Sequence, residues 1–158
     1  MTEKRYEKKS VIIEMESRQS IPGVDALPVL LRMEGIWYGG KDGHHLVYEE
    51  AQEDGEPVRC RLHIRSGQAE LTRRGPVEAK LLFVPGQKTH TDYRTPYGTL
   101  GLSILTEEVM LETDESALCV EMVYRMSAGE GEPADCSVRI RVKDSGRAAG
   151  DGGFFEGG

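Results

Sequence analysis

The sequence lacks several features that would place the chain in a familiar functional class. Its 158 residues contain no run near the ~18 apolar residues of a membrane helix, and the charged start does not resemble a signal peptide. Only 6% of the residues are aromatic and 38% are hydrophobic. The formal net charge of −7 argues against binding to a phosphate backbone. We therefore expect one domain that has neither a membrane nor a nucleic acid as its partner.

Cysteine is scarce, with three residues far apart in the chain: Cys60, Cys119 and Cys136. An odd number without CxxC or Cys–His spacing predicts neither a disulfide framework nor a zinc site. Each cysteine lies in an apolar or alternating run, where a free thiol packs as a small hydrophobic group. We therefore expect buried thiols and a reducing, cytoplasmic location.

Helical periodicity is also absent, because apolar and polar residues alternate along most of the chain. The clearest predicted strand covers residues 58–65, where the four apolar side chains should point inward while Arg59, Arg61 and Arg65 stay in solvent. Clusters of Gly, Pro and Asp interrupt such runs at nearly even intervals. This pattern predicts roughly eight to eleven short strands joined by short loops.

An antiparallel meander of this length must curl, because exposed edge strands would pair with other chains. We predict an all-β fold, a single antiparallel up-and-down β-barrel, with a two-sheet sandwich as the second architecture that fits the pattern. A helical turn fits only in residues 21–27, where prolines keep it short. The barrel domain is expected over residues 1–143, and a flexible Gly-rich tail over residues 144–158.

Three blocks of the sequence share their order and spacing with a known family. They are Glu34-Gly35-Ile36-Trp37-Tyr38 with the 41–50 segment that follows, Leu71-Thr72-Arg73-Arg74-Gly75, and Tyr93-Arg94-Thr95-Pro96-Tyr97-Gly98. The third block leads into an apolar strand and a Thr-Glu-Glu turn at residues 106–108. Over residues 9–143 the chain resembles the DUF1934 family of small bacterial proteins. The resemblance implies a calycin-like (lipocalin-like) β-barrel, and it brings no established activity, catalytic residue or cofactor.

The aromatic and basic residues of these blocks are the candidate ligand-binding residues: Tyr38, Tyr48, Arg73, Arg94 and Tyr97. A barrel of eight or more strands either fills its interior with side chains or holds one small ligand. Tyrosine rings near a barrel mouth, with an arginine for charge, suit an amphipathic or anionic ligand. Alternatively, Tyr97 caps the barrel and bonds the backbone through its hydroxyl. The first hypothesis predicts that Tyr97→Ala weakens binding, and the second that it lowers stability alone.

Other groups of reactive or charged residues give weaker evidence for a functional site. His90 and Asp92 share one face of a predicted strand, but two ligands do not make a metal site, so we expect no metal. The basic residues of the 58–65 strand lack the aromatic partners that a single-strand nucleic-acid binder stacks on its bases. We interpret them as a solvated face opposite carboxylates such as Glu70 or Glu50.

The function predicted from the sequence is binding of a small hydrophobic or amphipathic ligand inside the barrel, without catalysis and without a cofactor. A protein-interaction or structural module with a filled barrel is the alternative. An interior filled by large side chains such as Met33, Phe83, Leu102 and Met122 would favour this alternative. A third reading is an enzyme that uses Arg73 and a tyrosine as electrostatic and acid groups, although no motif points to a reaction.

Overall fold

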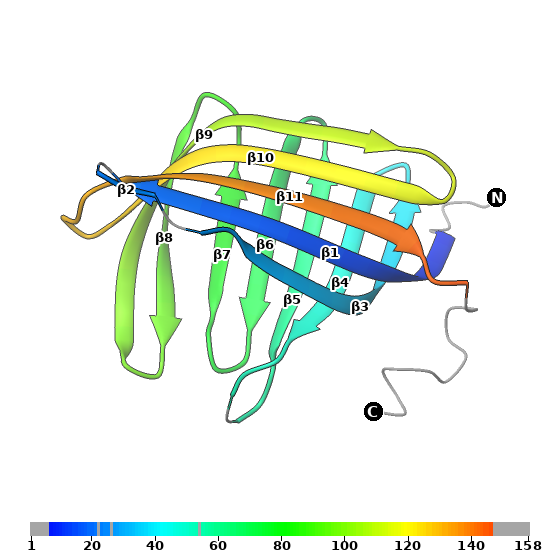
Figure 1. The fold of residues 1–158 in the computed structure, drawn as a ribbon, viewed down its shortest axis with the longest axis horizontal. Coiled ribbons are helices and arrows are strands. Elements are labelled where there is room, and N and C mark those ends of the chain that lie inside the picture. Colours follow the sequence, from blue (N-terminus) through cyan, green and yellow to red (C-terminus); the bar gives the residue numbers. More distant parts are fainter. Residues whose placement is uncertain (1–6, 22, 26, 54, 147–158) are drawn as a thin grey trace.

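The computed structural model describes residues 7–21, 23–25, 27–53 and 55–146. Within them the backbone forms eleven β-strands and no helix (Figure 1). These residues accordingly include no helix with the length and apolar character needed to cross a membrane. The strands are β1 (Glu7–Ile21), β2 (Val24–Asp25), β3 (Val29–Gly40), β4 (Gly43–Glu50), β5 (Val58–Arg65), β6 (Gln68–Arg74), β7 (Ala79–Phe83), β8 (Lys88–Thr95), β9 (Gly98–Thr113), β10 (Ala117–Ala128) and β11 (Ala134–Asp144). The predicted all-β class is confirmed.

The strands follow one another around a barrel in their order along the chain. Each strand from β3 to β7, and again from β8 to β11, pairs antiparallel with its neighbour in sequence. β1 completes the circuit because Val11 lies opposite Gly35 of β3 on one side and Asp144 of β11 on the other. The short β2 pairs only with β1 among the described strands. The fold is therefore the predicted up-and-down barrel and not a two-sheet sandwich.

The barrel is nearly closed, with a seam between β7 and β8. In place of a ladder, one isolated bridge joins the described residues here: the backbone N–H groups of Glu78 and Arg94 each donate to the other's carbonyl, at 3.0 and 2.9 Å. Further along the seam, the Thr89 hydroxyl donates to the Leu82 carbonyl at 2.8 Å. At the seam, a side-chain hydrogen bond thus joins β7 and β8, whereas backbone hydrogen bonds join the other neighbouring strands.

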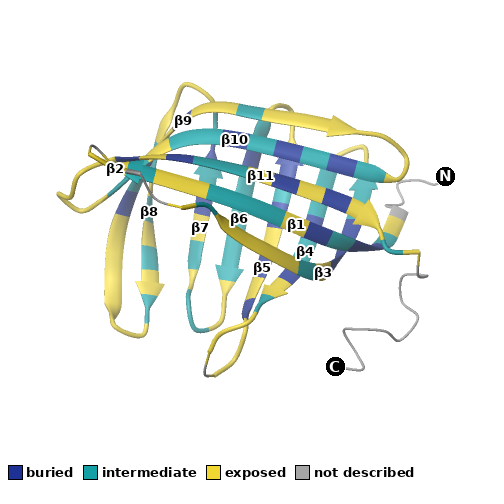
Figure 2. Ribbon diagram, in the orientation of Figure 1, coloured by how far each residue is buried: buried dark blue, intermediate teal, exposed yellow. Residues whose placement is uncertain are grey.

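Alternation along the strands produces the core. In β5, the four apolar side chains from Val58 to Ile64 are at most 2% exposed, whereas Arg59, Arg61 and Arg65 face solvent. The predicted inward row is confirmed, and Figure 2 shows buried and exposed bands alternating along several strands. Burial of an aliphatic side chain of this size stabilises the fold by about 1.5–3 kcal/mol.

The described part of residues 21–27, the segment in which the sequence allows a helical turn, contains none. β1 ends at Ile21, and Val24 of β2 pairs back onto it. Gly23 has a φ of 82°, a conformation that a tight hairpin requires and that glycine adopts without strain. Continued pairing with β1 therefore takes precedence over a local helical turn.

The Thr-Glu-Glu turn predicted at residues 106–108 is also wrong. β9 runs unbroken through this point, and its register against β10 shifts between Val123 and Tyr124. Glu107 is the extra residue, since Thr106 and Glu108 both have partners on β10. A β-bulge of this kind bends a strand without ending it.

The predicted flexible tail, residues 144–158, lies outside the described residues from position 147 onward. Asp144 is the last residue of β11, and the backbone N–H of Ser145 donates to the Ser10 carbonyl at 2.9 Å. The first residues assigned to the tail are thus attached to the barrel wall.

The pairing between β3 and β4 ends halfway along β3. Their ladder runs from Gly40–Gly43 to Gly35–Tyr48, while residues 29–34 pair with β1 alone among the described strands. Figure 1 shows β4 turning away from the first half of β3. A Cβ atom on Gly35 would lie 2.7 Å from the Val47 carbonyl oxygen, so glycine permits the close approach at the point of divergence. The first half of β3 consequently has one unpaired edge.

Candidate functional site

The inner wall near this unpaired edge carries polar and charged side chains. Tyr48 of β4 lies opposite Cys60 of β5, which in turn lies opposite Arg73 of β6. Directly opposed residues share one face of a sheet, and Cys60 belongs to the buried row, so all three face the interior. Glu50 follows Tyr48 by two residues and faces the same way. A carboxylate and a guanidinium therefore lie inside an otherwise apolar wall.

Glu50 and Arg73 form an ion pair within the barrel. Arg73 Nη2 lies 2.6 Å from Glu50 Oε1, and each side chain is only 18% exposed. Burial opposes the charged form of Arg73, but the Glu50 carboxylate, together with Tyr93 and Cys60, outweighs this effect, and the pKa of the guanidinium is raised. Arg73 Nε is buried and has no hydrogen-bond partner among the described residues. This N–H group therefore lacks the acceptor that a buried donor normally has.

The neighbouring hydroxyl and thiol are held in their protonated forms. Tyr48 is 2% exposed, and burial, together with the nearby Cys60 and Glu50, raises the pKa of its hydroxyl. Burial and the Glu50 carboxylate raise the pKa of the Cys60 thiol to about 12. Because the thiolate is the nucleophilic form, Cys60 is unreactive near neutral pH. These groups can bind a polar atom, and neither is an activated nucleophile.

Two inward-facing apolar side chains, on β3 and β9, keep accessible surface. Leu31 lies opposite Met15 of β1, and Leu100 lies opposite Tyr93 of β8; Met15 and Tyr93 pack against the core, so both leucines face inward. Leu31 is nevertheless 43% exposed and Leu100 is 50% exposed. Inward-facing leucines in close-packed interiors have almost no exposed surface. The barrel is therefore incompletely filled at these positions.

The middle of the barrel is packed. Phe83, Leu102 and Met122 are 3%, 8% and 4% exposed and belong to one continuous core cluster, with Met33 partly buried against it. The ring of Phe83 meets that of Tyr124 edge-on, with their centroids 4.9 Å apart. The side chains named as a plug from the sequence do fill the interior, and accessible inward surface remains at Leu31 and Leu100.

The structure brings together two of the five predicted ligand-binding residues, Tyr48 and Arg73, and separates the others from them. Tyr38 follows the inward-facing, buried Trp37, and so lies on the outer face of β3. Arg94 follows an inward-facing residue of β8 and is exposed on the outer face. Alternation explains both positions, because adjacent residues of one strand point to opposite faces.

Tyr97 lies at the tip of the β8–β9 hairpin and is 98% exposed. Its backbone N–H donates to Thr95 Oγ1 at 3.0 Å, which fixes the turn. Its ring therefore neither lines a portal nor caps the barrel, in contrast to both sequence hypotheses.

Sequence reasoning missed Glu50, which was expected to face the arginines on the outside. The sequence does contain a signal for this orientation. Leu46, Tyr48 and Glu50 are two residues apart along one strand and therefore share a face, so an inward-facing Leu46 predicts an inward-facing Glu50. On the outer face, Arg59 lies opposite Glu49 instead.

A second polar cluster occupies the other end of β4. The Trp37 indole Nε1 donates to His44 Nδ1 at 3.0 Å. Lys9 Nζ lies 5.2 Å from the centroid of the Trp37 ring and donates to the Glu115 carbonyl oxygen. This cluster links β1, β3 and β4 to the β9–β10 turn.

His90 and Asp92, the two residues considered as metal ligands, lie on the surface. His90 Nδ1 lies 3.0 Å from Ser103 Oγ, and both His90 and Asp92 are exposed. The described residues contain no group of three or more His, Cys, Asp and Glu side chains that could hold a metal ion.

Comparison with known proteins agrees with the barrel. Residues 13–140 match the family described as a domain of unknown function, DUF1934. The uncharacterized beta-barrel protein YwiB of Bacillus subtilis (strain 168) is 26% identical over 99 residues, which cover 63% of this chain and 69% of that protein. The crystal structure of the ywiB protein from Bacillus subtilis has a TM-score of 0.79 at 20% identity, covering 89% of this chain and 95% of that chain; at this identity the likeness shows the fold alone. Because the family match spans most of the chain, this β-barrel protein belongs to the DUF1934 family.

Proposed function

We propose that the protein binds a small amphipathic molecule inside the barrel, beside the unpaired edge of β3. The apolar part of the ligand lies against Leu31 and Leu100, which face inward and keep accessible surface. Its polar part, which carries an acceptor oxygen, meets Arg73. The Glu50 carboxylate already balances the charge of Arg73, so the ligand need not be an anion.

The observation that carries this proposal is the buried Nε of Arg73, which has no partner among the described residues. An unsatisfied buried donor costs about 1–3 kcal/mol, and an acceptor oxygen from a ligand removes that cost. A barrel that served structure alone would gain stability from an apolar residue at this position, since a buried ion pair is often replaceable by well-packed hydrophobic side chains.

Binding without catalysis is part of the proposal. Protonated Tyr48 and Cys60 supply hydrogen-bonding capacity and no nucleophile. No cofactor is proposed. A cytoplasmic location is supported by three free cysteines, of which Cys60 and Cys136 are buried. The packed middle of the barrel supports the alternative of an interaction module, and the following experiment separates the two.

The test uses Nile red, a neutral amphipathic dye with a carbonyl acceptor, and two neighbouring leucines of β3. Leu31→Gln introduces a polar group on the inner face, and we expect about tenfold weaker dye binding by fluorescence titration. Leu30→Gln is the matched control, because Leu30 is 71% exposed on the outer face of the same strand. Equal affinities of the two variants, or non-saturable dye binding by the unmodified protein, would rule out the interior site.

The role of the ion pair is tested separately. The double variant Glu50→Gln with Arg73→Gln removes both charges together, so neither is left buried and unpaired. We expect weaker dye binding than in the unmodified protein, with cooperative thermal unfolding retained. Unchanged dye affinity in a folded double variant would show that the ligand's polar part lies elsewhere.

A further inference from the structure

The outer surface of β4 to β7 concentrates positive charge, and we refer to it as the basic face. Its side chains surround a depression of about 630 Å³. The residues that matter here are Arg59, Arg61, Thr72, Arg74, Lys80 and Glu70. Thr72 lies at the centre, opposite Arg61 on one neighbouring strand and Lys80 on the other.

The arginines of the basic face lack carboxylate partners. Arg59, Arg61 and Arg74 form no ion pair with any residue that the structure describes. Lys80 does pair, with Glu70 at 3.6 Å. Arg59 lies opposite Glu49 on β4, without forming an ion pair with it, and opposite Arg74 on β6, where like charges destabilise a sheet. Stability of the fold does not account for the juxtaposition of Arg59 and Arg74.

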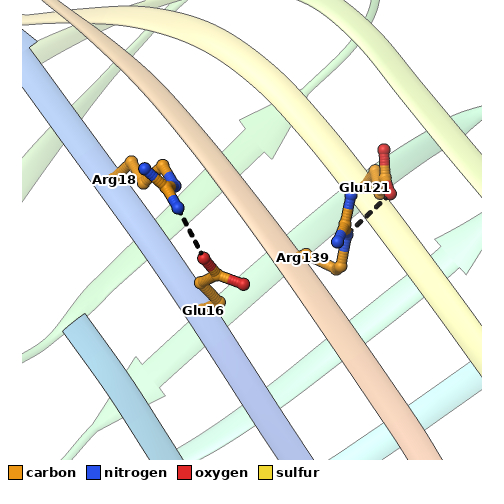
Figure 3. A network of polar contacts seen from close by, with 4 residues as sticks. All are labelled: Glu16, Arg18, Glu121 and Arg139. Atoms are coloured by element: carbon orange, nitrogen blue, oxygen red, sulfur yellow. Dashed lines mark hydrogen bonds and ion pairs between the residues drawn. The ribbon is translucent and has the colours of Figure 1, made fainter. Parts of the chain in front are cut away.

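The outer face of β1, β10 and β11 has the opposite character (Figure 3). Arg18 pairs with Glu16 at 3.0 Å, and Arg139 pairs with Glu121 at 2.8 Å. Carboxylates are abundant in the protein, whose formal net charge is −7. The lack of ion pairs at the arginines of the basic face therefore does not result from a shortage of acidic residues in the protein.

We propose that the basic face binds a small molecule carrying two or more phosphate groups. A guanidinium fork donates two parallel hydrogen bonds to phosphate oxygens and keeps its charge at every physiological pH. Arg61 and Arg74 are diagonal neighbours on adjacent strands, about 7–8 Å apart at the backbone, and their long side chains can reach two linked phosphates. The Thr72 hydroxyl, two residues before Arg74 and opposite Arg61, adds a donor to the same anion.

The surface suits a compact oligophosphate better than a nucleic acid. The lining of the depression contains no Phe, Tyr or Trp on which bases could stack. Its two imidazoles, His45 and His63, stack on each other with centroids 4.0 Å apart. The net negative charge of the protein also repels a long polyanion beyond the basic face.

Isothermal titration with inorganic tripolyphosphate at fixed ionic strength tests this proposal. We expect saturable binding that Arg61→Gln weakens about tenfold or more, because a hydrogen-bonded charge pair is lost. The control is Arg65→Gln, on the same strand and the same exposed face but outside the depression. That variant should change the affinity by less than about twofold, as expected for screened charges at a distance.

The variants are expected to fold, since the exchanged side chains are exposed. Without ligand, Arg74→Gln should leave the melting temperature unchanged or raise it, because the repulsion from Arg59 is removed. Equal loss of affinity in the Arg61 and Arg65 variants would indicate diffuse charge attraction and overturn the proposal. Absence of saturable tripolyphosphate binding, or tighter binding of single-stranded RNA than of tripolyphosphate, would overturn it as well.

Discussion

His44 accepts a hydrogen bond that acid removes. The Trp37 indole can only donate, so His44 Nδ1 must be unprotonated when it accepts at 3.0 Å. Burial lowers the pKa of His44 below its ordinary value of 6.5, which favours this neutral form in the folded protein. The unfolded chain binds the proton more readily. The stabilisation from neutral His44 is therefore complete above pH 6.5 and is lost as the pH falls through the lower pKa of the folded state.

This linkage predicts a pH-dependent change in tryptophan fluorescence, because Trp37 is the single tryptophan of the chain. As the pH falls below 6.5, protonation of His44 should remove the acceptor, shift the Trp37 emission and lower the melting temperature. His44→Gln should abolish the fluorescence transition. His45→Gln is the control, since that imidazole faces outward and stacks on His63. A transition that persists unchanged in the His44 variant would contradict the assignment.

Tyr97 illustrates how exposure decides between hypotheses for one residue. With 98% of its surface in solvent, the ring contributes little to packing. Tyr97→Ala should change the free energy of unfolding by less than about 0.5 kcal/mol, and should leave Nile red affinity unchanged. Urea denaturation and dye titration of the same variant check both statements. A stability loss above about 1 kcal/mol would restore the cap hypothesis.

Among the elements, β3 depends on a glycine at the point where it diverges from β4. An added Cβ at Gly35 would meet Ile13 Cδ1 and the Val47 carbonyl oxygen, each at 2.7 Å, and the backbone atom cannot move aside alone. Gly35→Ala should therefore destabilise the protein by about 1–3 kcal/mol, the usual cost of overpacking. Gly101→Ala provides the control, because Gly101 lies in β9 with no atom within 4 Å of an added Cβ. Equal melting temperatures for the two variants would show that β3 and β4 can separate further without penalty.

The sequence predicts the elements well where alternation is strict and poorly where pairing changes. In the 58–65 strand, apolar residues define one face and polar residues the other, so its predicted bounds and buried row agree with the structure. The β9 bulge at Glu107 leaves no such mark, because a polar Thr-Glu-Glu segment is compatible with a turn as well as an exposed strand. At the site, alternation identifies the inward position of Arg73, but its partnership with Glu50 requires the register between β4, β5 and β6.

For the whole molecule, the sequence predicts that the barrel closes only through the general argument that sheet edges must be covered. Where the barrel closes is set by long-range pairing, which local alternation does not encode. The incomplete ladder between β3 and β4 has the same origin, and it leaves the inward-facing, exposed Leu31 on a stretch of β3 that pairs on one side only. Charge is also distributed at this scale, because acidic residues form ion pairs with arginines on the outer face of β1, β10 and β11, while Arg59, Arg61 and Arg74 of the basic face form none with the described residues.

The ladder between β1 and β11 has a consequence for how the chain folds. Apart from the β1–β3 ladder, which spans the short β2, all other ladders of the described barrel join strands that are neighbours along the chain, and hairpins of that kind form within about 1–10 μs. The chain can thus assemble two half-sheets early, one from β1 to β7 and one from β8 to β11. Their union must bring Val11 to Asp144, a contact between distant parts of the chain, and such non-local contacts form slowly. Until they meet, β1, β7, β8 and β11 are free edges, so the folding chain is most prone to pair with other copies of itself just before it closes.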